Sequence, residues 1–170
     1  MPIEINFQNA KEQSFDPLPR GLYDAVVFDA EMRQVKNEGG KLPVGTPMLA
    51  VQFKIQATDG QEEHENRRVF RQFVIAPAEL DGVPYANKQM MDDILFTFYR
   101  AIGYNESELK KWKKLPDPDE LAGRECVVDV RLREYPKGSG EYQNEVANVK
   151  PAGSSTGAGE LASKGGLGGL

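Results

Sequence analysis

The most regular pattern in the chain is an alternation of apolar and polar side chains between residues 48 and 57. The apolar positions are Leu49, Val51, Phe53, Ile55 and Ala57. Because successive side chains of a strand point to opposite faces, a period of two places all of them on one face. Asp59 and Gly60 follow as a turn dipeptide. The pattern predicts a β-strand with one buried face and one face in water.

Four further stretches have strand-like patterns, at residues 21–33, 67–75, 126–133 and 142–149. The first has apolar side chains on both faces, which is typical of a strand that is covered on both sides or strongly coiled. The stretch at 126–133 alternates cleanly again and begins with Cys126. Together with residues 48–57, these stretches predict five strands.

One helical pattern lies between the third and fourth predicted strands, from Asn87 to Gly103. Its apolar residues recur every three or four positions, at Met91, Ile94, Leu95, Phe98 and Ile102. Gly103 is a natural C-cap. A second, short helix is predicted over 106–114, with Asn105 as N-cap and Glu108 completing a capping box.

The resulting β-β-β-α-β-β order predicts a mainly β fold, an OB-like five-stranded barrel with one helix between strands 3 and 4. The expected domain spans residues 20–151, preceded by an N-terminal arm, 1–19, and followed by a tail, 152–170. The tail is rich in Gly and Ser and is predicted to be flexible. In an OB barrel, the loops at 34–46 and 135–141 would flank the ligand face.

Composition is that of an ordinary globular domain, with 39% hydrophobic residues, 28% charged residues and a net charge of −5. No apolar run reaches the length of a membrane span, and the N-terminus lacks the pattern of a signal peptide. The single cysteine excludes an internal disulfide, in keeping with a reducing cytosol. Net acidity weighs against non-specific polyanion binding but leaves room for a local basic groove.

The residues offer little for catalysis. The only histidine, His64, has no second His or Cys at ligand spacing, and it is expected to lie in a solvated loop. Cys126 lies on the apolar face of its strand and is expected to be a small buried hydrophobe rather than a nucleophile. Gly39-Gly40-Lys41 lacks the spacing of a phosphate-binding loop. We expect no enzyme, no metal and no cofactor.

Nucleic-acid binding has better candidates. Single-strand binders combine cations that follow the phosphate backbone with aromatic rings that stack on bases. The strand cations are Lys54, Arg67, Arg68, Arg71, Arg131 and Arg133, the loop cations include Lys41 and Lys137, and the aromatic candidates are Phe70, Tyr135 and Tyr142. The alternative is that these cations form the wet face of a sheet and that Phe70 belongs to the core.

Several motifs resemble a family of small phage-encoded proteins, long uncharacterised, that are similar to OB-fold single-stranded DNA-binding proteins. The motifs are LPRGLYDA at 18–25, TPML at 46–49 leading into VQFKI at 51–55, AIG at 101–103, PDELAGR at 118–124 and NEVANV at 144–149. The resemblance spans about residues 15–151. It implies sequence-tolerant coating of single strands during phage replication or recombination, in the host bacterial cytoplasm. The neutral tail departs from the acidic tail usual in replicative single-strand binders.

Two other functions stay open. One is an OB-like module that binds a phage or host protein, with Leu161, Leu167 and Leu170 of the tail as a docking peptide. The other is a virion structural protein. The expected partners of the favoured function are single-stranded DNA, a phage replication or recombination protein and further copies of the chain, with no membrane.

Overall fold

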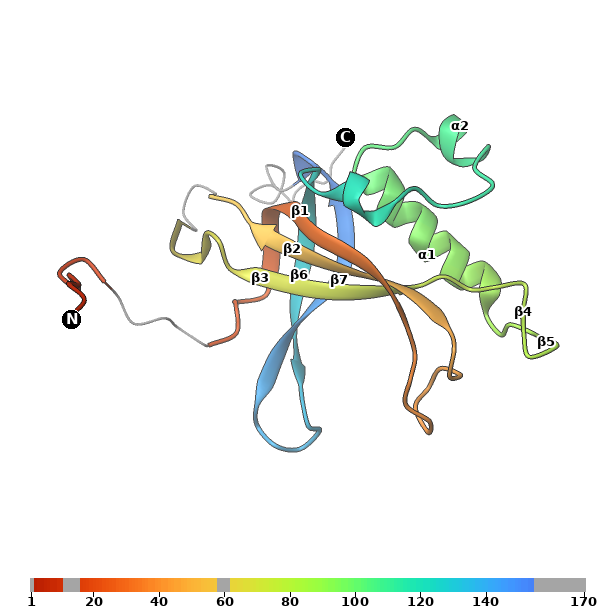
Figure 1. Ribbon diagram of the computed structural model, residues 1–170, viewed down its shortest axis with the longest axis horizontal. Coiled ribbons are helices and arrows are strands. Elements are labelled where there is room, and N and C mark those ends of the chain that lie inside the picture. Colours follow the sequence, from red (N-terminus) through yellow and green to blue (C-terminus); the bar gives the residue numbers. More distant parts are fainter. Residues whose placement is uncertain (1, 11–15, 58–61, 155–170) are drawn as a thin grey trace.

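The computed structural model describes residues 2–10, 16–57 and 62–154. Its main feature is a twisted, antiparallel, five-stranded sheet with the order β3-β2-β1-β6-β7 (Figure 1). The strands are β1 (Gly21–Gln34), β2 (Pro47–Ile55), β3 (Arg68–Val74), β6 (Glu125–Glu134) and β7 (Tyr142–Pro151). Each matches one of the five predicted strands to within two residues. The mainly β prediction is therefore confirmed.

The central strand, β1, organises the sheet because it pairs with β6 from Gly21 to Val26 and with β2 from Ala25 to Gln34. Ala25 is opposite Ile55 on one side and Cys126 on the other. The register with β2 shifts between Val27 and Asp29, so that Phe28 is the extra residue of a β-bulge. Bulges increase the local twist of a strand. Here the bulge accompanies the strong coiling of the sheet.

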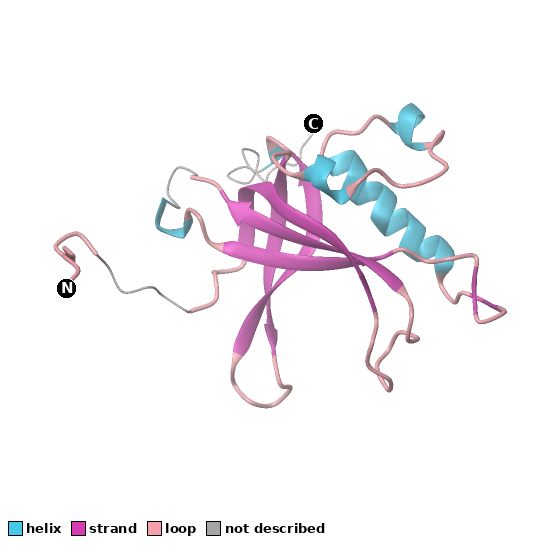
Figure 2. Ribbon diagram, viewed as in Figure 1, coloured by secondary structure: helices cyan, strands magenta, loops and turns pink. Residues whose placement is uncertain are grey.

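The smaller elements lie in the connections (Figure 2). They are η1 (Glu62–His64), the hairpin of β4 (Glu79–Leu80) and β5 (Val83–Pro84), α1 (Lys88–Ala101), α2 (Glu106–Leu109) and η2 (Pro118–Leu121). The helix between the third and fourth strands of the sheet is confirmed as α1. The second helix is shorter than predicted because α2 ends at Leu109. Asn105 does cap it, accepting a hydrogen bond from the Ser107 N–H at 2.8 Å.

The hydrophobic core lies between α1 and the inner face of the sheet. Phe98 of α1 stacks on Phe73 of β3, with 4.4 Å between ring centroids, and meets Phe53 of β2 edge-on at 6.3 Å. All three rings are buried. Such rings bury large apolar areas and gain further from their mutual geometry. The core thus fixes α1 against β2 and β3.

The sheet is not closed into a barrel, which corrects the expected five-stranded barrel. Its edge strands, β3 and β7, form no ladder with each other in the described part of the chain. Arg71 spans the seam between them instead. Its Nη1 donates to the carbonyl oxygens of Val146 and Ala147, at 3.0 and 2.6 Å. A side chain, rather than backbone pairing, joins the two edges.

The guanidinium of Arg71 is half-buried in this seam and lies 4.9 Å from the Phe73 ring centroid. Burial lowers the pKa of Arg71, because removing a cation from water disfavours its charged form. The two hydrogen bonds to the carbonyl oxygens of β7 offset that loss of hydration. Hydrogen bonds to charged groups contribute about 1.5–3 kcal/mol, so the seam depends strongly on this residue.

We expect Arg71→Ala to lower the free energy of unfolding by about 1.5–3 kcal/mol, because it leaves two β7 carbonyls without their donor. The matched control is Arg133→Ala. Arg133 is exposed and pairs with the exposed Glu145 at 3.5 Å, and an ion pair of that kind contributes at most about 1 kcal/mol. Urea unfolding of both variants measures the difference. Equal losses would show that Arg71 does not hold the seam.

Cys126 is buried at the start of β6, as expected of a small core hydrophobe. Burial raises the pKa of its thiol from 9.0 to about 12, since a thiolate would lack solvation there. The reactive thiolate is therefore scarce at any pH near neutrality. The residue has a packing role in the native chain.

We expect a disulfide reagent at pH 8 to modify native Cys126 at least about a thousandfold more slowly than the unfolded chain, because thiolate is the nucleophile. Absorbance of the released thiol measures both rates, and the control is the same reaction in denaturant. Rapid labelling of the folded protein would contradict the burial of this residue.

Candidate functional site

An aromatic ring and two cations meet on the outer face of the sheet, at the β1 bulge. Phe28 is 41% exposed, and the Arg68 guanidinium carbon lies 4.0 Å from its ring centroid. Lys54 Nζ lies 5.6 Å from the same centroid. Lys54 and Arg68 are direct partners in the β2–β3 ladder. We call Phe28, Lys54 and Arg68 the outer cluster.

Both cations of the outer cluster are available to an anion. The ion pairs found among the described residues belong to other groups, namely Arg33, His64, Lys88, Arg131 and Arg133. Arg68 otherwise makes one long hydrogen bond, from Nη1 to Gln52 Oε1 at 3.4 Å. A phosphate could therefore approach without displacing a carboxylate.

Phe70 lies next along the same face of β3, two residues after Arg68 and opposite Gln52. Its side chain is 61% exposed, whereas Val69 and Phe73 on the inner face are buried. The alternative that Phe70 belongs to the core is therefore wrong. An aromatic ring this exposed on a strand has a free face on which a planar group can stack.

Two of the predicted cations are held by backbone carbonyls. Arg67 Nη2 donates to the Asp16 carbonyl at 2.6 Å, and Arg71 lies in the seam. Both are partly buried. Their contact with a nucleic acid stays a prediction, but each already has a defined structural partner.

The two loops expected to flank a ligand project from the same side of the sheet, below β3 in Figure 1. Lys41 is exposed in the β1–β2 loop, and Lys137 is exposed in the β6–β7 loop. Tyr135 and Tyr142 are exposed at the base of the β6–β7 loop, where the Arg133 guanidinium carbon lies 5.7 Å from the Tyr135 ring centroid.

The β6–β7 loop is braced from within by Glu134. Its carboxylate accepts hydrogen bonds from the N–H groups of Gly138 and Gly140, at 3.0 and 2.8 Å. These bonds lower the pKa of Glu134, because they favour its charged form. The loop thus has a defined shape, which reduces the entropy that a ligand contact would cost.

Two open grooves lie along the end of β3. One, of about 870 Å³, lies along the base of the β1–β2 loop and includes Arg33, Lys36 and Gln72. The other, of about 670 Å³, lies between β3 and β7 and includes Phe70, Gln72 and Arg133. Gln72 lines both, so the two grooves adjoin. We call them together the interloop groove.

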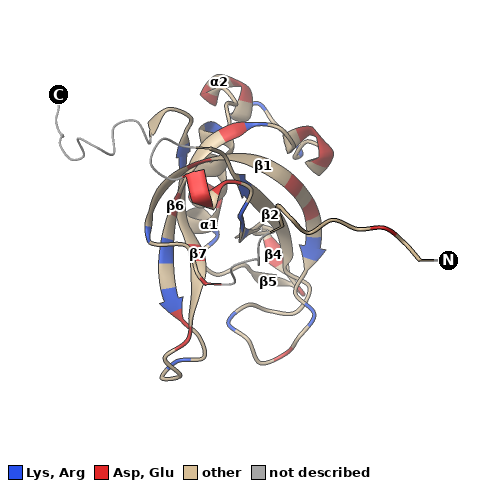
Figure 3. Cartoon of the chain, turned by 90° about the vertical axis from the view of Figure 1, so that its left-hand side faces the viewer, with Lys and Arg blue, Asp and Glu red and all other residues tan. Residues whose placement is uncertain are grey.

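Charge along the interloop groove is mixed. Figure 3 shows Lys and Arg segments alternating with Asp and Glu segments on the β6–β7 hairpin. Arg131 pairs with Asp129 at 3.2 Å, and Arg133 pairs with Glu145 at 3.5 Å. The Arg133–Glu145 pair is exposed on both sides and contributes at most about 1 kcal/mol. A phosphate could compete with the carboxylates for these arginines. The net electrostatic field of the groove is nevertheless weak, because charges of both signs lie along it.

The geometry offers little to a metal. Among residues 2–10, 16–57 and 62–154, no three His, Cys, Asp or Glu side chains gather closely enough to hold an ion. His64 is not the solvated loop residue expected from its acidic surroundings, because its ring packs edge-on against Tyr23 at 5.8 Å between centroids. No helix in the described chain has the length and apolarity needed to cross a membrane. Leu161, Leu167 and Leu170 lie outside the described residues.

Sequence reasoning did not identify Phe28. Its apolar character suggested a covered strand face, although the alternation of β1 places it on the face opposite to the buried Val27. The basic run at residues 110–114, KKWKK, was also missed as a surface feature because it was assigned to a helix. A count of lysines within five residues would have found it.

We expect Phe70→Ala to change the free energy of unfolding by less than about 1 kcal/mol, because its ring is mostly in water already. Phe73→Ala, on the opposite face of the same strand, should cost about 3–5 kcal/mol. Urea unfolding compares the two. A large loss from Phe70→Ala would show that the ring packs in solution rather than standing free.

The chain matches a protein family over residues 5–160, a range that includes the whole sheet and every helix of the described chain. The family is described as "Protein of unknown function (DUF669)", and the chain belongs to it. No curated protein matches the chain.

Proposed function

We propose that this DUF669 protein binds single-stranded DNA in a sequence-tolerant way, with the strand running over the outer cluster and along the interloop groove. The observation that carries the proposal is the exposed ring of Phe70 beside two available cations, Lys54 and Arg68, on one strand face. Stacking platforms with neighbouring cations are what single-strand binders use, because every base has a π-face and every nucleotide a phosphate.

The two aromatic rings of this face have different roles in the proposal. Arg68 already covers the ring of Phe28 at 4.0 Å, so Phe28 holds the guanidinium in place for a phosphate. Phe70 is more exposed and presents its ring to a base. Tyr135 and Tyr142 extend the aromatic surface at the far end of the groove, and Lys41 and Lys137 approach it from the two loops.

The strand order of the sheet supports the same location for the DNA-binding face. A sheet order of β3-β2-β1-β6-β7, with a helix after the third strand, is the strand order of an OB-fold. OB-folds bind oligonucleotides on the face of their second and third strands, between the loops that join strands 1–2 and 4–5. The corresponding face here is that of β2 and β3, and the corresponding loops flank the interloop groove. The setting that the sequence resemblance implies, phage replication or recombination in the host bacterial cytoplasm, belongs to the same proposal.

A second candidate function is a protein-interaction module. The alternation of charge along the β6–β7 hairpin and the net charge of −5 favour it, because polyanion binders usually gather basic residues on one face. The two functions are distinguished by a labelled oligonucleotide, because only the first predicts that the protein binds it.

We expect a labelled single-stranded oligonucleotide to bind with a modest salt dependence. Log affinity should fall with log salt with a slope of about −1.5 to −3, because roughly two to four phosphates meet available cations and each contributes about −0.7. Fluorescence anisotropy at several salt concentrations measures the slope, with duplex DNA as the control. Absence of binding at low salt, or equal affinity for duplex, would refute the proposal in favour of a protein-interaction module.

We expect Phe70→Ala to weaken single-strand binding by about 1–3 kcal/mol, the contribution of one base stacked on an aromatic ring. Arg68→Ala should weaken binding and reduce the salt slope by about 0.7. The matched controls are Met90→Ala, an exposed apolar residue on α1, and Lys111→Ala, an exposed cation after α2. Anisotropy titrations compare the four variants. Equal effects from the controls would place the strand elsewhere.

A further inference from the structure

The N-terminal arm presents three large apolar side chains to water. Ile3, Ile5 and Phe7 are 87%, 69% and 72% exposed. They alternate with Glu4 and Asn6, so in an extended chain they share one face. Large apolar side chains exposed in a row mark an interaction site rather than a stable surface. The arm therefore has an apolar face that lacks a covering partner within the described chain.

A groove at α1 is suited to such a face. It has a volume of about 820 Å³ and lies between α1 and the segment that follows α2. Its apolar floor includes Leu95, Phe96, Tyr99, Trp112 and Leu115. Lys113 and Lys114 line it too, as does Lys88. We call it the lysine-rimmed groove.

Charge favours an acidic segment as the occupant. Lys113 and Lys114 take part in none of the ion pairs among the described residues. The two carboxylates of the groove are already engaged: Asp92 pairs with Lys88 at 2.9 Å, and Asp117 accepts the Asp119 N–H at 3.0 Å. An arm whose apolar face lay on the floor would carry Glu4 on its other face, within reach of the lysine rim.

The aromatic floor is less suited to stacked bases. Trp112 meets Tyr99 and Tyr104 edge-on, with centroids 5.2 and 5.0 Å apart. These contacts fix the indole within a packed cluster, so it is not a free platform like Phe70. Aliphatic side chains can fill such a floor, whereas a base needs an open ring face. The groove therefore fits an apolar peptide better than a nucleic acid.

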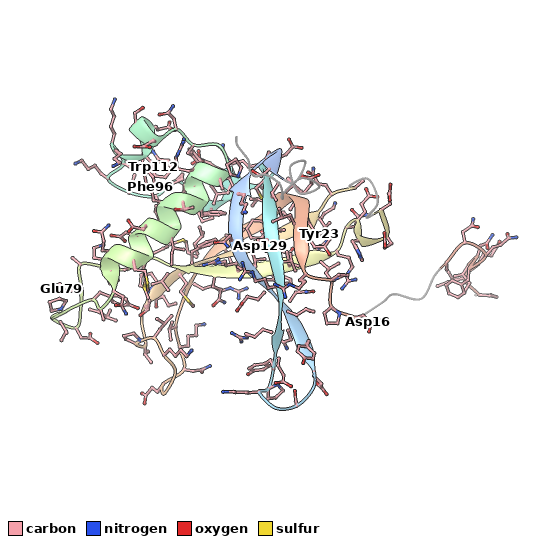
Figure 4. All side chains as sticks on the ribbon, turned by 180° about the vertical axis from the view of Figure 1, so that it is seen from behind. Asp16, Tyr23, Glu79, Phe96, Trp112 and Asp129 are labelled. Carbon is pink, nitrogen blue, oxygen red and sulfur yellow. The ribbon has the colours of Figure 1, made fainter. Side chains whose placement is uncertain are left out.

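Arm and groove lie at opposite ends of the molecule. Figure 4 shows Asp16, where the described chain resumes after the arm, far from Phe96 and Trp112. Ten residues, 8–17, separate Phe7 from the buried Leu18. Fully extended, they would span at most about 35 Å. An arm on a linker of that length could enter the groove of a neighbouring molecule that lies end to end with the first.

We propose that the N-terminal arm of one copy docks, in extended form, in the lysine-rimmed groove of a second copy. Ile3, Ile5 and Phe7 would contact the apolar floor, and Glu4 would face Lys113 or Lys114. Because arm and groove are different surfaces, the contact is heterologous, and each copy can accept one neighbour and supply another. Repetition produces an open row of copies.

The first test is a titration with a synthetic peptide of residues 1–10, read by the emission of Trp112, the sole tryptophan. The receptor is the full chain with Ile3→Ser, Ile5→Ser and Phe7→Ser, so that its own arm does not compete. We expect a saturable change in emission with the native peptide and none with a peptide carrying the same three serines. No response, or equal responses to both peptides, overturns the proposal.

Charge reversal tests the rim. Lys113→Glu with Lys114→Glu, added to the same receptor, should raise the peptide Kd about tenfold, since two attractive charges become repulsive. The matched control is Lys111→Glu with Lys137→Glu, which changes the net charge equally but lies outside the groove lining. Equal effects of the two pairs would overturn the assignment of the rim.

Sedimentation velocity tests the assembly without DNA. Wild type should associate as its concentration rises, whereas the arm variant alone and the Lys113→Glu/Lys114→Glu variant alone should stay monomeric. Their mixture should form a species of two copies and nothing larger, because one lacks the arm and the other lacks the rim. A monomeric wild type whose Trp112 emission differs from that of the arm variant would place the arm in its own groove and overturn the proposal.

A nucleic acid in the groove is the remaining outcome. A single-stranded oligonucleotide that displaces the arm peptide and quenches Trp112, but does neither in the Lys113→Glu/Lys114→Glu variant, would assign the groove to nucleic acid instead. That result overturns the docking of the arm and leaves the binding face on β2 and β3 untouched.

Discussion

The two bonds that Arg71 makes to β7 join the two edges of an otherwise open sheet. A sheet coiled this strongly brings its edge strands face to face, and a ladder between β3 and β7 would complete a barrel. The Arg71 guanidinium occupies that place and donates to two carbonyls of β7. Because a side chain joins the edges, the space on either side of it stays open. One such space is the part of the interloop groove that contains Phe70 and Arg133.

Phe28, at the β1 bulge, has the complementary effect on the outer face. Val27 is buried on the inner face, so the regular alternation of the strand already places Phe28 on the outer face. The bulge shifts the alternation that follows, so that Ala30 is buried again, and the Phe28 ring lies beside Lys54 and Arg68. A guanidinium held over a ring loses less conformational freedom when it binds a phosphate than one that moves freely in water. The seam shapes the groove, and the ring of Phe28 orders the cations beside it.

Much of this architecture is visible in the sequence. Strands β2 and β6 alternate most clearly, and periodicity alone predicts their limits to within two residues. It also predicts the buried face of β2, whereas in β6 Val127 is buried on the opposite face and Leu132 is 43% exposed. The same rule, applied strictly to β3, places Arg71 on the inner face with Val69 and Phe73, and thus separates it from Arg68 and Phe70. That parity distinguishes Arg71 from the exposed cations of the strands. The register of the strand already indicated which of them would be buried.

Other features leave too weak a trace to be predicted. The β4–β5 hairpin has two residues in each strand, which is too short for any periodicity. The Phe28 bulge depends on how β1 pairs with β2, and pairing is a tertiary property. The absence of a ladder between β3 and β7 likewise depends on where two distant strands end. The sequence therefore indicates which residue types could form the site. It does not show which of those side chains are free to contact a ligand.

Net charge is a poor guide to what this surface binds, because many of its carboxylates have local partners. Glu134 accepts two backbone N–H groups of its own loop, and Asp117 and Glu120 form the capping box of η2. Asp129 and Glu145 pair with arginines of β6. Lys54 and Arg68, by contrast, lie over an aromatic ring, which attracts them without neutralising them. A chain with a net charge of −5 can thus present locally available cations, and the arrangement of its partners, more than the sum of its charges, determines which anions it can hold.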